Sequence, residues 1–284
     1  MIQNNSYKKP LKNVKSNSSK SYDSMNQKAN NFTPIKKIGY LKTHKCASTS
    51  VQNILLRYAI RNNLKVVLPP KGGNILGYDQ IFNRNLLESS FWEKALGYEI
   101  SYDMFLCHAR WNKNEVSYVL NDTGKNDVFY FTFLRDPVDL FISYWDYNAF
   151  GVEFGPLKEF LSEKVALQLR NKTEYIWNKQ YQYNCGGYNI MLYDFGLECK
   201  DMTDVKKVDN KIREIGASFD LILLSDDEYF DDSIILLKNS INWKNEDMVN
   251  FKLNTISPLD KTYLPDAERN LLKGKKNIIY KIIY

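Results

Sequence analysis

The stretch Ile35-Lys-Lys-Ile-Gly-Tyr-Leu-Lys-Thr-His-Lys-Cys-Ala-Ser-Thr-Ser50 runs from an apolar segment through a basic turn into a helical pattern. Residues 35–41 alternate enough to predict a strand, and residues 43–47 a turn. Residues 48–61 predict a helix, because apolar side chains recur there every three or four positions. A strand, a loop and a helix in this order are the first unit of an α/β fold.

The same alternation continues along the chain. Short, nearly continuous apolar segments predict four more strands, at residues 65–68, 104–107, 128–134 and 221–224. Helical spacing lies between them, over residues 112–120, 138–147, 205–215 and 231–241. Apolar strands separated by helices are typical of a parallel sheet covered on both faces. We therefore expect an α/β class domain over residues 34–284, with a central parallel sheet flanked by helices on both faces.

The first 33 residues form a basic arm rich in asparagine, serine and lysine. They hold six lysines against one aspartate and show no apolar periodicity, so we expect this arm to be disordered. Most of the net charge of +6 lies in the arm, which leaves the remainder of the chain nearly neutral. A nearly neutral domain argues against a nucleic-acid partner, whose binding requires many neutralised phosphates, whereas a small anion needs only a local positive pocket.

Membrane, metal and disulfide signals are weak. No apolar run reaches the roughly 18 residues of a membrane span, and no signal peptide is visible. Five Asn-x-Ser/Thr sequons would matter only in a secretory lumen; they begin at Asn4, Asn17, Asn31, Asn121 and Asn171. The four cysteines lack zinc spacing, so we expect no metal site. Cys185 and Cys199 are either bridged or free thiols.

The loop of residues 42–50 carries two lysines and several hydroxyls. A loop that opens a helix presents free N–H groups at the positive end of the helix dipole, which suits a phosphate. Lys45 can place its charge on a phosphate oxygen while hydroxyls and amides surround the rest. The glycines of a Walker A loop are absent, which disfavours hydrolysis of nucleoside triphosphates. The alternative is a serine-capped helix with solvated lysines.

A second basic motif, Phe133-Leu-Arg-Asp-Pro137, ends a later strand. Its Arg135 is expected at the carboxyl edge of the sheet, where α/β proteins bind ligands. Ser143 follows about two helical turns later. The guanidinium can hold a second phosphate, with the Ser143 hydroxyl donating beside it. The alternative is a surface ion pair of Arg135 with Asp136 or Asp139.

Together the two motifs resemble the phosphate-binding signatures of sulfotransferases that use 3′-phosphoadenylyl sulfate (PAPS). The chain is more closely similar to the galactose-3-O-sulfotransferases, the group that includes galactosylceramide sulfotransferase. This resemblance covers roughly residues 35–260. It is carried by residues 41–48, the helix at residues 51–55, Leu76-Gly77-Tyr78, Cys107-His108-Ala109-Arg110 and Phe219-Asp220-Leu221.

The resemblance implies a P-loop-like sulfotransferase fold and sulfuryl transfer from PAPS to a galactose hydroxyl, expected to be the 3-OH, of a glycolipid or a galactose-terminated glycan. It also implies a set of PAPS-binding residues, namely Lys42, Thr43, Lys45, Cys46, Ala47, Ser48, Thr49, Ser50, Arg135 and Ser143. Within this set, Cys46 stands where a hydroxyl residue is expected.

Only two histidines occur, and both match the family pattern. We expect His108 to be the general base, since imidazole titrates near neutral pH, and Lys45 to offset the charge of the leaving nucleotide. The acceptor is expected to meet His44, Arg110 and Trp111. The alternatives are structural histidines and, for the tryptophan, core packing.

Two further function classes stay open. One is a sulfotransferase for uronic acid or hexosamine, and the other is a nucleotide-binding or carbohydrate-binding protein without catalysis. The resemblance implies a Golgi membrane protein. Because the family's anchor is missing and Tyr284 comes before the family's usual end, we expect a longer natural chain.

Overall fold

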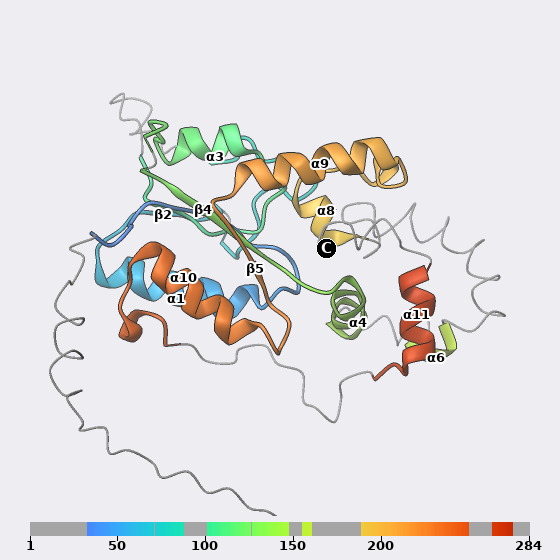
Figure 1. Ribbon diagram of the computed structural model, residues 1–284. Helices are drawn as coiled ribbons and strands as arrows, with labels where there is room; N and C mark the ends of the chain where they lie inside the picture. Colours follow the sequence, from blue (N-terminus) through green and yellow to red (C-terminus); the bar gives the residue numbers. More distant parts are fainter. Residues whose placement is uncertain are drawn as a thin grey trace, which may run out of the picture. The chain divides into compact units, whose positions relative to one another are not determined.

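The computed structural model describes residues 33–70, 72–87, 101–125, 127–147, 155–160, 189–249 and 263–274 (Figure 1). The disordered arm predicted for residues 1–33 falls outside these ranges except for Thr33. Of the two alternatives for Cys185 and Cys199, the structure has Cys199 in a disulfide, and Cys185 lies outside the described ranges.

A five-stranded parallel sheet forms the centre of the fold, in the strand order β2-β3-β1-β4-β5. The strands are β1 (Ile38–Leu41), β2 (Val66–Val67), β3 (Met104–Phe105), β4 (Phe129–Leu134) and β5 (Leu221–Leu224). Each lies within a predicted apolar segment. β2 and β3 are only two residues long, and the chain after β3 continues through isolated bridges at His108 and Arg110.

Helices cover both faces of this sheet. In Figure 1, α3 and α9 lie on one side and α1 and α10 on the other. Five helices match the predicted ones: α1 (Ser48–Arg61), α3 (Lys113–Val119), α4 (Pro137–Tyr147), α9 (Val205–Ser218) and α10 (Phe230–Ile241). The predicted α/β class with helices on both faces is therefore confirmed.

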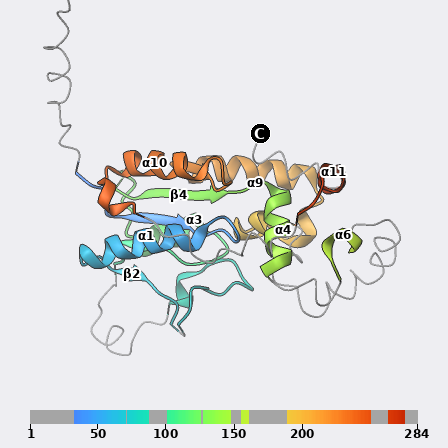
Figure 2. The ribbon, with the colours of Figure 1, turned by 90° about the horizontal axis from the view of Figure 1, so that it is seen from below.

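The remaining elements are short. They comprise the helices α6 (Leu157–Phe160), α8 (Ile190–Asp194) and α11 (Asp266–Gly274), and the 3₁₀ turns η1 (Arg84–Leu86), η3 (Cys199–Asp201) and η4 (Asn245–Asp247). In the view from below, α4 and α11 lie together at one end of the sheet (Figure 2). Within the described ranges, no helix combines the length and apolar character needed to cross a bilayer.

The parallel direction of the strands decides where the site lies. The carboxyl ends of β1, β3 and β4 meet at one edge of the sheet, and the segments that follow them carry Lys42, His108 and Arg135. Buried hydroxyls fix the register at this edge. Thr132 donates to the carbonyl of Leu41 at 3.1 Å, and Thr43 donates to the carbonyl of Phe133 at 2.6 Å.

One glycine allows the two central strands to pack closely. Gly39 of β1 pairs with Tyr130 of β4, and a Cβ placed on Gly39 would lie 2.4 Å from Cδ1 of the buried Tyr130 ring. We expect Gly39→Ala to lower the free energy of unfolding by about 1–3 kcal/mol, because the ring must shift within a packed core.

Urea denaturation measures this change, and Gly216→Ala in α9 is its matched control. A Cβ at Gly216 meets no atom within 4 Å, so alanine there is expected to stabilise the helix by about 1 kcal/mol. Equal effects of the two substitutions would show that the Tyr130 contact does not limit packing.

Candidate functional site

The loop between β1 and α1 has an unusual backbone. Lys45 and Ala47 both adopt left-handed conformations, with φ of 59° and 50°, although neither is glycine. Such a conformation costs a non-glycine residue roughly 1–2 kcal/mol. Ala47 is the N-cap of α1 and offers no side-chain cap to the N–H groups of the first turn. Backbone N–H groups in such a loop at a helix N-terminus suit an anion.

Two cations meet at this loop. Arg135 donates from Nη1 to the carbonyl oxygen of Lys45 at 3.0 Å, and the Lys45 ammonium lies 3.9 Å from the centre of the Tyr147 ring. Burial, together with the positive charge of Arg135, lowers the pKa of Lys45 to about 8. A bound anion would offset this unfavourable desolvation and repulsion. Ser143 is half-buried on α4, the helix that follows Arg135.

Other loop residues predicted to bind the donor are occupied within the fold. The Thr43 hydroxyl is held by β4, as described above. Cys46 is fully buried, donates from Sγ to the carbonyl of His44 at 3.3 Å, and has a pKa raised to about 12 by burial. The side chains of Thr43 and Cys46 are therefore part of the protein interior, and the Thr43 N–H is also engaged, since it donates to the carbonyl of Leu41 at 3.1 Å. Ser48 and Ser50 are buried at the start of α1.

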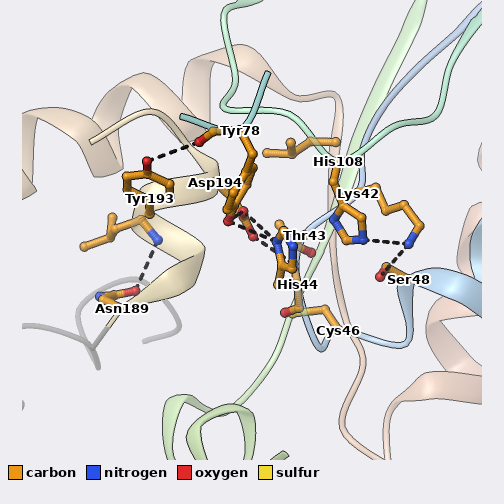
Figure 3. Close-up of polar contacts among 12 residues, drawn as sticks. Lys42, Thr43, His44, Cys46, Ser48, Tyr78, His108, Asn189, Tyr193 and Asp194 are labelled. Carbon is orange, nitrogen blue, oxygen red and sulfur yellow. Dashed lines mark hydrogen bonds and ion pairs between the residues drawn. The ribbon is translucent and has the colours of Figure 1, made fainter. Parts of the chain in front are cut away.

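Lys42 points toward His108 rather than along the loop (Figure 3). Its Nζ lies 2.7 Å from Nε2 of His108 and 3.5 Å from Oγ of Ser48, and the lysine is only 1% exposed. Burial lowers the pKa of Lys42 to about 8. Burial and the charges of His44 and Lys42 hold the pKa of His108 well below its ordinary value. The imidazole is therefore neutral at pH 7, and Lys42 donates to its Nε2.

His44 stacks on His108, with ring centres 3.9 Å apart. Asp194, the last residue of α8, is fully buried and faces His44. Its Oδ2 accepts from the His44 backbone N–H at 2.8 Å, and its Oδ1 lies 2.9 Å from His44 Nδ1. The Tyr78 hydroxyl donates to the same Oδ1. In the part of the chain that the structure describes, no group of three or more His, Cys, Asp or Glu side chains is placed to hold a metal ion.

Asp194 and Tyr78 are site residues that the sequence patterns do not predict. The available signal for Asp194 was its place in Ile190-Met-Leu-Tyr-Asp-Phe195, where it is the one acidic residue in an apolar run. A carboxylate in such a run is rarely buried without a partner. Tyr78 lies in the family-like segment that ends at residue 78, but nothing local identifies its partner, which is 116 positions away.

Two residues expected at the acceptor site are engaged elsewhere. Trp111 is buried, stacks on Phe219 with ring centres 4.9 Å apart, and meets Phe105 edge-on. This placement favours the packing alternative, and the role of Trp111 at the acceptor site stays a prediction. Arg110 is also buried, and its Nη2 pairs with Oε1 of Glu198 at 2.8 Å while its guanidinium covers the Tyr193 ring.

Comparison with known proteins gives a consistent picture. Residues 5–266 match the family model described as galactose-3-O-sulfotransferase. Mouse galactose-3-O-sulfotransferase 2 is 31% identical over 248 residues, which are 84% of this chain and 58% of the relative. Human galactosylceramide sulfotransferase is 31% identical over 236 residues, 81% of this chain and 51% of the relative. Mouse galactose-3-O-sulfotransferase 3 is 28% identical over 221 residues, 76% of this chain and 47% of the relative.

The chain thus spans about half the length of the curated relatives it matches. The family match covers the whole site described above, from the loop after β1 to Asp194. This chain belongs to the galactose-3-O-sulfotransferase family.

Proposed function

We propose that this chain transfers a sulfuryl group from PAPS to a galactose hydroxyl, the 3-OH, of a glycolipid such as galactosylceramide or of a galactose-terminated glycan. The observation that carries the proposal is the meeting of Lys45 and Arg135 at the edge of the sheet where the two histidines stack. The names of the relatives, which include galactose-3-O-sulfotransferase 2 and galactosylceramide sulfotransferase, support the same acceptor class.

The donor would be held by cations at two places. Lys45 and the N–H groups at the start of α1 are suited to the phosphosulfate end of PAPS, and Arg135 with Ser143 to its 3′-phosphate. The left-handed backbone and the lowered pKa of Lys45 fit such a polyanion. PAPS supplies the sulfuryl group. Lys45 offsets the negative charge that grows on the bridging oxygen as its bond to sulfur breaks, by analogy with phosphoryl transfer.

His108 takes the proton of the attacking hydroxyl in this proposal. The hydroxyl oxygen forms a bond to sulfur, its proton passes to the neutral imidazole, and adenosine 3′,5′-bisphosphate departs. The depressed pKa of His108 keeps the ring unprotonated at pH 7. Lys42 donates a hydrogen bond to Nε2 of His108. This hydrogen bond must break before the Nε2 lone pair can accept the proton of the hydroxyl. The Lys42 pKa of about 8 makes such a change accessible near neutral pH.

Transfer of radiolabelled sulfate tests the proposal directly. Purified full chain with labelled PAPS is expected to label galactosylceramide or galactose-terminated glycans. Labelling of uronic-acid or hexosamine glycans instead would favour the rival acceptor class. Binding of adenosine 3′,5′-bisphosphate without transfer to any of these acceptors would favour a non-catalytic binding protein.

Donor affinity should depend on pH through Lys45. Its pKa of about 8 means that the free loop loses a positive charge as pH rises through that value. A bound polyanion favours the charged form, so calorimetry should give the highest affinity for adenosine 3′,5′-bisphosphate near pH 7, because the phosphate monoesters of the ligand themselves take up protons near about pH 6. The affinity should then weaken above about pH 8, by up to roughly tenfold per pH unit.

Lys45→Arg is the matched control, because a guanidinium stays charged in this range. The variant should flatten the pH profile, with any remaining slope belonging to Lys42. An affinity that stays constant between about pH 7 and pH 9 in the unmodified protein would contradict a role for Lys45 in binding the anion.

We also propose that the chain acts in the Golgi lumen at the membrane, as the family resemblance implies. Asn121 begins the one sequon that starts within the described ranges, and its residue is exposed. After expression through a secretory pathway, endoglycosidase treatment should increase gel mobility, and Asn121→Gln should remove part of that shift. A chain that carries no glycan in such cells would oppose this location.

A further inference from the structure

We propose that Asp194 is a positioning residue that fixes the tautomer of His44, so that His44 presents the lone pair of Nε2 to a hydroxyl of the acceptor other than the one that His108 deprotonates. This inference rests on the proposed function for its chemistry, and on the geometry of α8, the β1–α1 loop and the Tyr78 segment for its structure.

The contacts define which atom of His44 carries the hydrogen. A carboxylate accepts hydrogen bonds and cannot donate them. Because Oδ1 of Asp194 lies 2.9 Å from Nδ1 of His44, the hydrogen of the neutral ring belongs on Nδ1. The Nε2 lone pair is then left for a ligand. The hydrogen bonds of His44 to the residues that the structure describes use its backbone N–H and Nδ1.

Tyr78 completes the arrangement. Burial and the charge of Asp194 raise the pKa of Tyr78 well above its ordinary value, so its hydroxyl stays protonated and donates to Oδ1. With the His44 backbone N–H on Oδ2, both carboxylate oxygens are satisfied. The orientation of the Asp194 side chain is therefore fixed by two segments outside its own helix (Figure 3).

The charge of Asp194 is hard to explain by anion binding. A carboxylate beside a loop meant for phosphate and sulfate repels the ligand, and burial of an ion is costly unless it is paired. The other charged or titratable groups that face His44 are Tyr78 and the imidazole of His108, with the ammonium groups of Lys42 and Lys45 nearby. Among these, Asp194 accepts two hydrogen bonds from His44, one from its backbone N–H and one from Nδ1. This pattern indicates that the carboxylate serves the histidine.

The competing explanation is that Asp194 only anchors the loop through the His44 backbone. Asp194→Asn separates the two roles. An amide oxygen can still accept from the backbone N–H, and its NH₂ group then faces Nδ1 and the Tyr78 hydroxyl. Nδ1 must in that case become an acceptor, and the ring hydrogen moves to Nε2. The loop keeps its anchor while the tautomer is reversed.

Nitrogen-15 NMR of the full chain reads the tautomer directly, because the protein has only two histidines. Spectra are recorded at about pH 8.5, well above the ordinary histidine pKa of about 6.5, and His44→Ala assigns the signals by removing one set. We expect an Nδ1–H tautomer for His44 in the unmodified protein and an Nε2–H tautomer in Asp194→Asn. An unmodified protein with Nε2–H, or a variant that keeps Nδ1–H, overturns the proposal even if no transferase activity is found.

Kinetics supply the second arm. Asp194→Asn is expected to lower kcat by on the order of 10²-fold, with KM for PAPS within about twofold, as expected when a histidine carries the wrong tautomer. In a His44→Ala background the same substitution should have almost no further effect, because Asp194 acts through that ring. A similar loss in both backgrounds would assign Asp194 to loop anchoring alone.

Asp247→Asn is the matched control. Asp247 is another largely buried aspartate, paired with Arg61 and touching neither histidine. Its replacement should leave kcat within about twofold and both tautomers unchanged. Equal losses from the two aspartate variants would mean that general destabilisation, and not the His44 tautomer, lowers the rate.

Discussion

Replacement of His108 with glutamine or alanine is expected to lower turnover by roughly 10²- to 10⁴-fold, the range lost when a general base is removed. We expect His108 to be this base because its imidazole is neutral, buried and stacked on the only other histidine of the chain. The affinity for adenosine 3′,5′-bisphosphate should stay within about twofold, since His108 follows β3 and not the anion-binding loop.

The glutamine variant is the sharper of the two. Its amide oxygen can accept the hydrogen bond from Lys42. Alanine, by contrast, would leave this buried ammonium without the Nε2 partner that lies 2.7 Å away in the unmodified protein. Glutamine cannot take a proton from a hydroxyl. Single-turnover sulfate transfer separates the chemical step from binding, and calorimetry measures the nucleotide. A near-normal kcat in His108→Gln would show that the proton goes to another group.

Arg135→Ala should lower the affinity for the donor rather than the rate of the chemical step. A hydrogen bond to a charged group contributes about 1.5–3 kcal/mol, so the affinity for adenosine 3′,5′-bisphosphate is expected to fall roughly 10- to 100-fold. Part of that loss comes through the loop, because Arg135 also holds the carbonyl of the left-handed Lys45 at 3.0 Å. At saturating donor, kcat should recover most of its value.

Two variants frame this result. Arg135→Lys keeps the charge without the planar fork and should fall between alanine and the unmodified protein. Arg61→Ala removes an arginine that pairs with Asp247 at the far end of α1. The nucleotide affinity of this variant should change by less than about twofold. If calorimetry gave Arg135→Ala and Arg61→Ala the same affinity, the assignment of Arg135 to the nucleotide would be wrong.

Most of the fold follows from the sequence because its strands are apolar blocks and its longer helices have a polar face. The block at residues 128–134 contains β4, and the helical spacing at residues 48–61 coincides with α1. α8 lacks such a signal. All five of its residues are buried, so it has no polar face from which a helical period could be recognised.

The site was predictable only in part, because strand ends can be located from sequence while side-chain directions cannot. Lys45 and Arg135, one from each basic motif, do meet at one edge of the sheet. Lys42, by contrast, turns to His108, a partner 66 positions away, and Trp111 turns into the core. Asp194 reaches His44 across 150 positions, a pairing that only the packing of α8 determines.

The central position of β1 in the sheet has a consequence for how this domain acquires its chemistry. β1 pairs with β3 on one side and with β4 on the other. His44, in the loop after β1, donates its backbone N–H to Asp194, which lies 150 positions further along the chain. A fold with many contacts between such remote parts of a chain forms slowly. Catalytic competence should therefore appear only once α8 has packed against the loop after β1, and a fragment that stops short of α8 would lack it entirely.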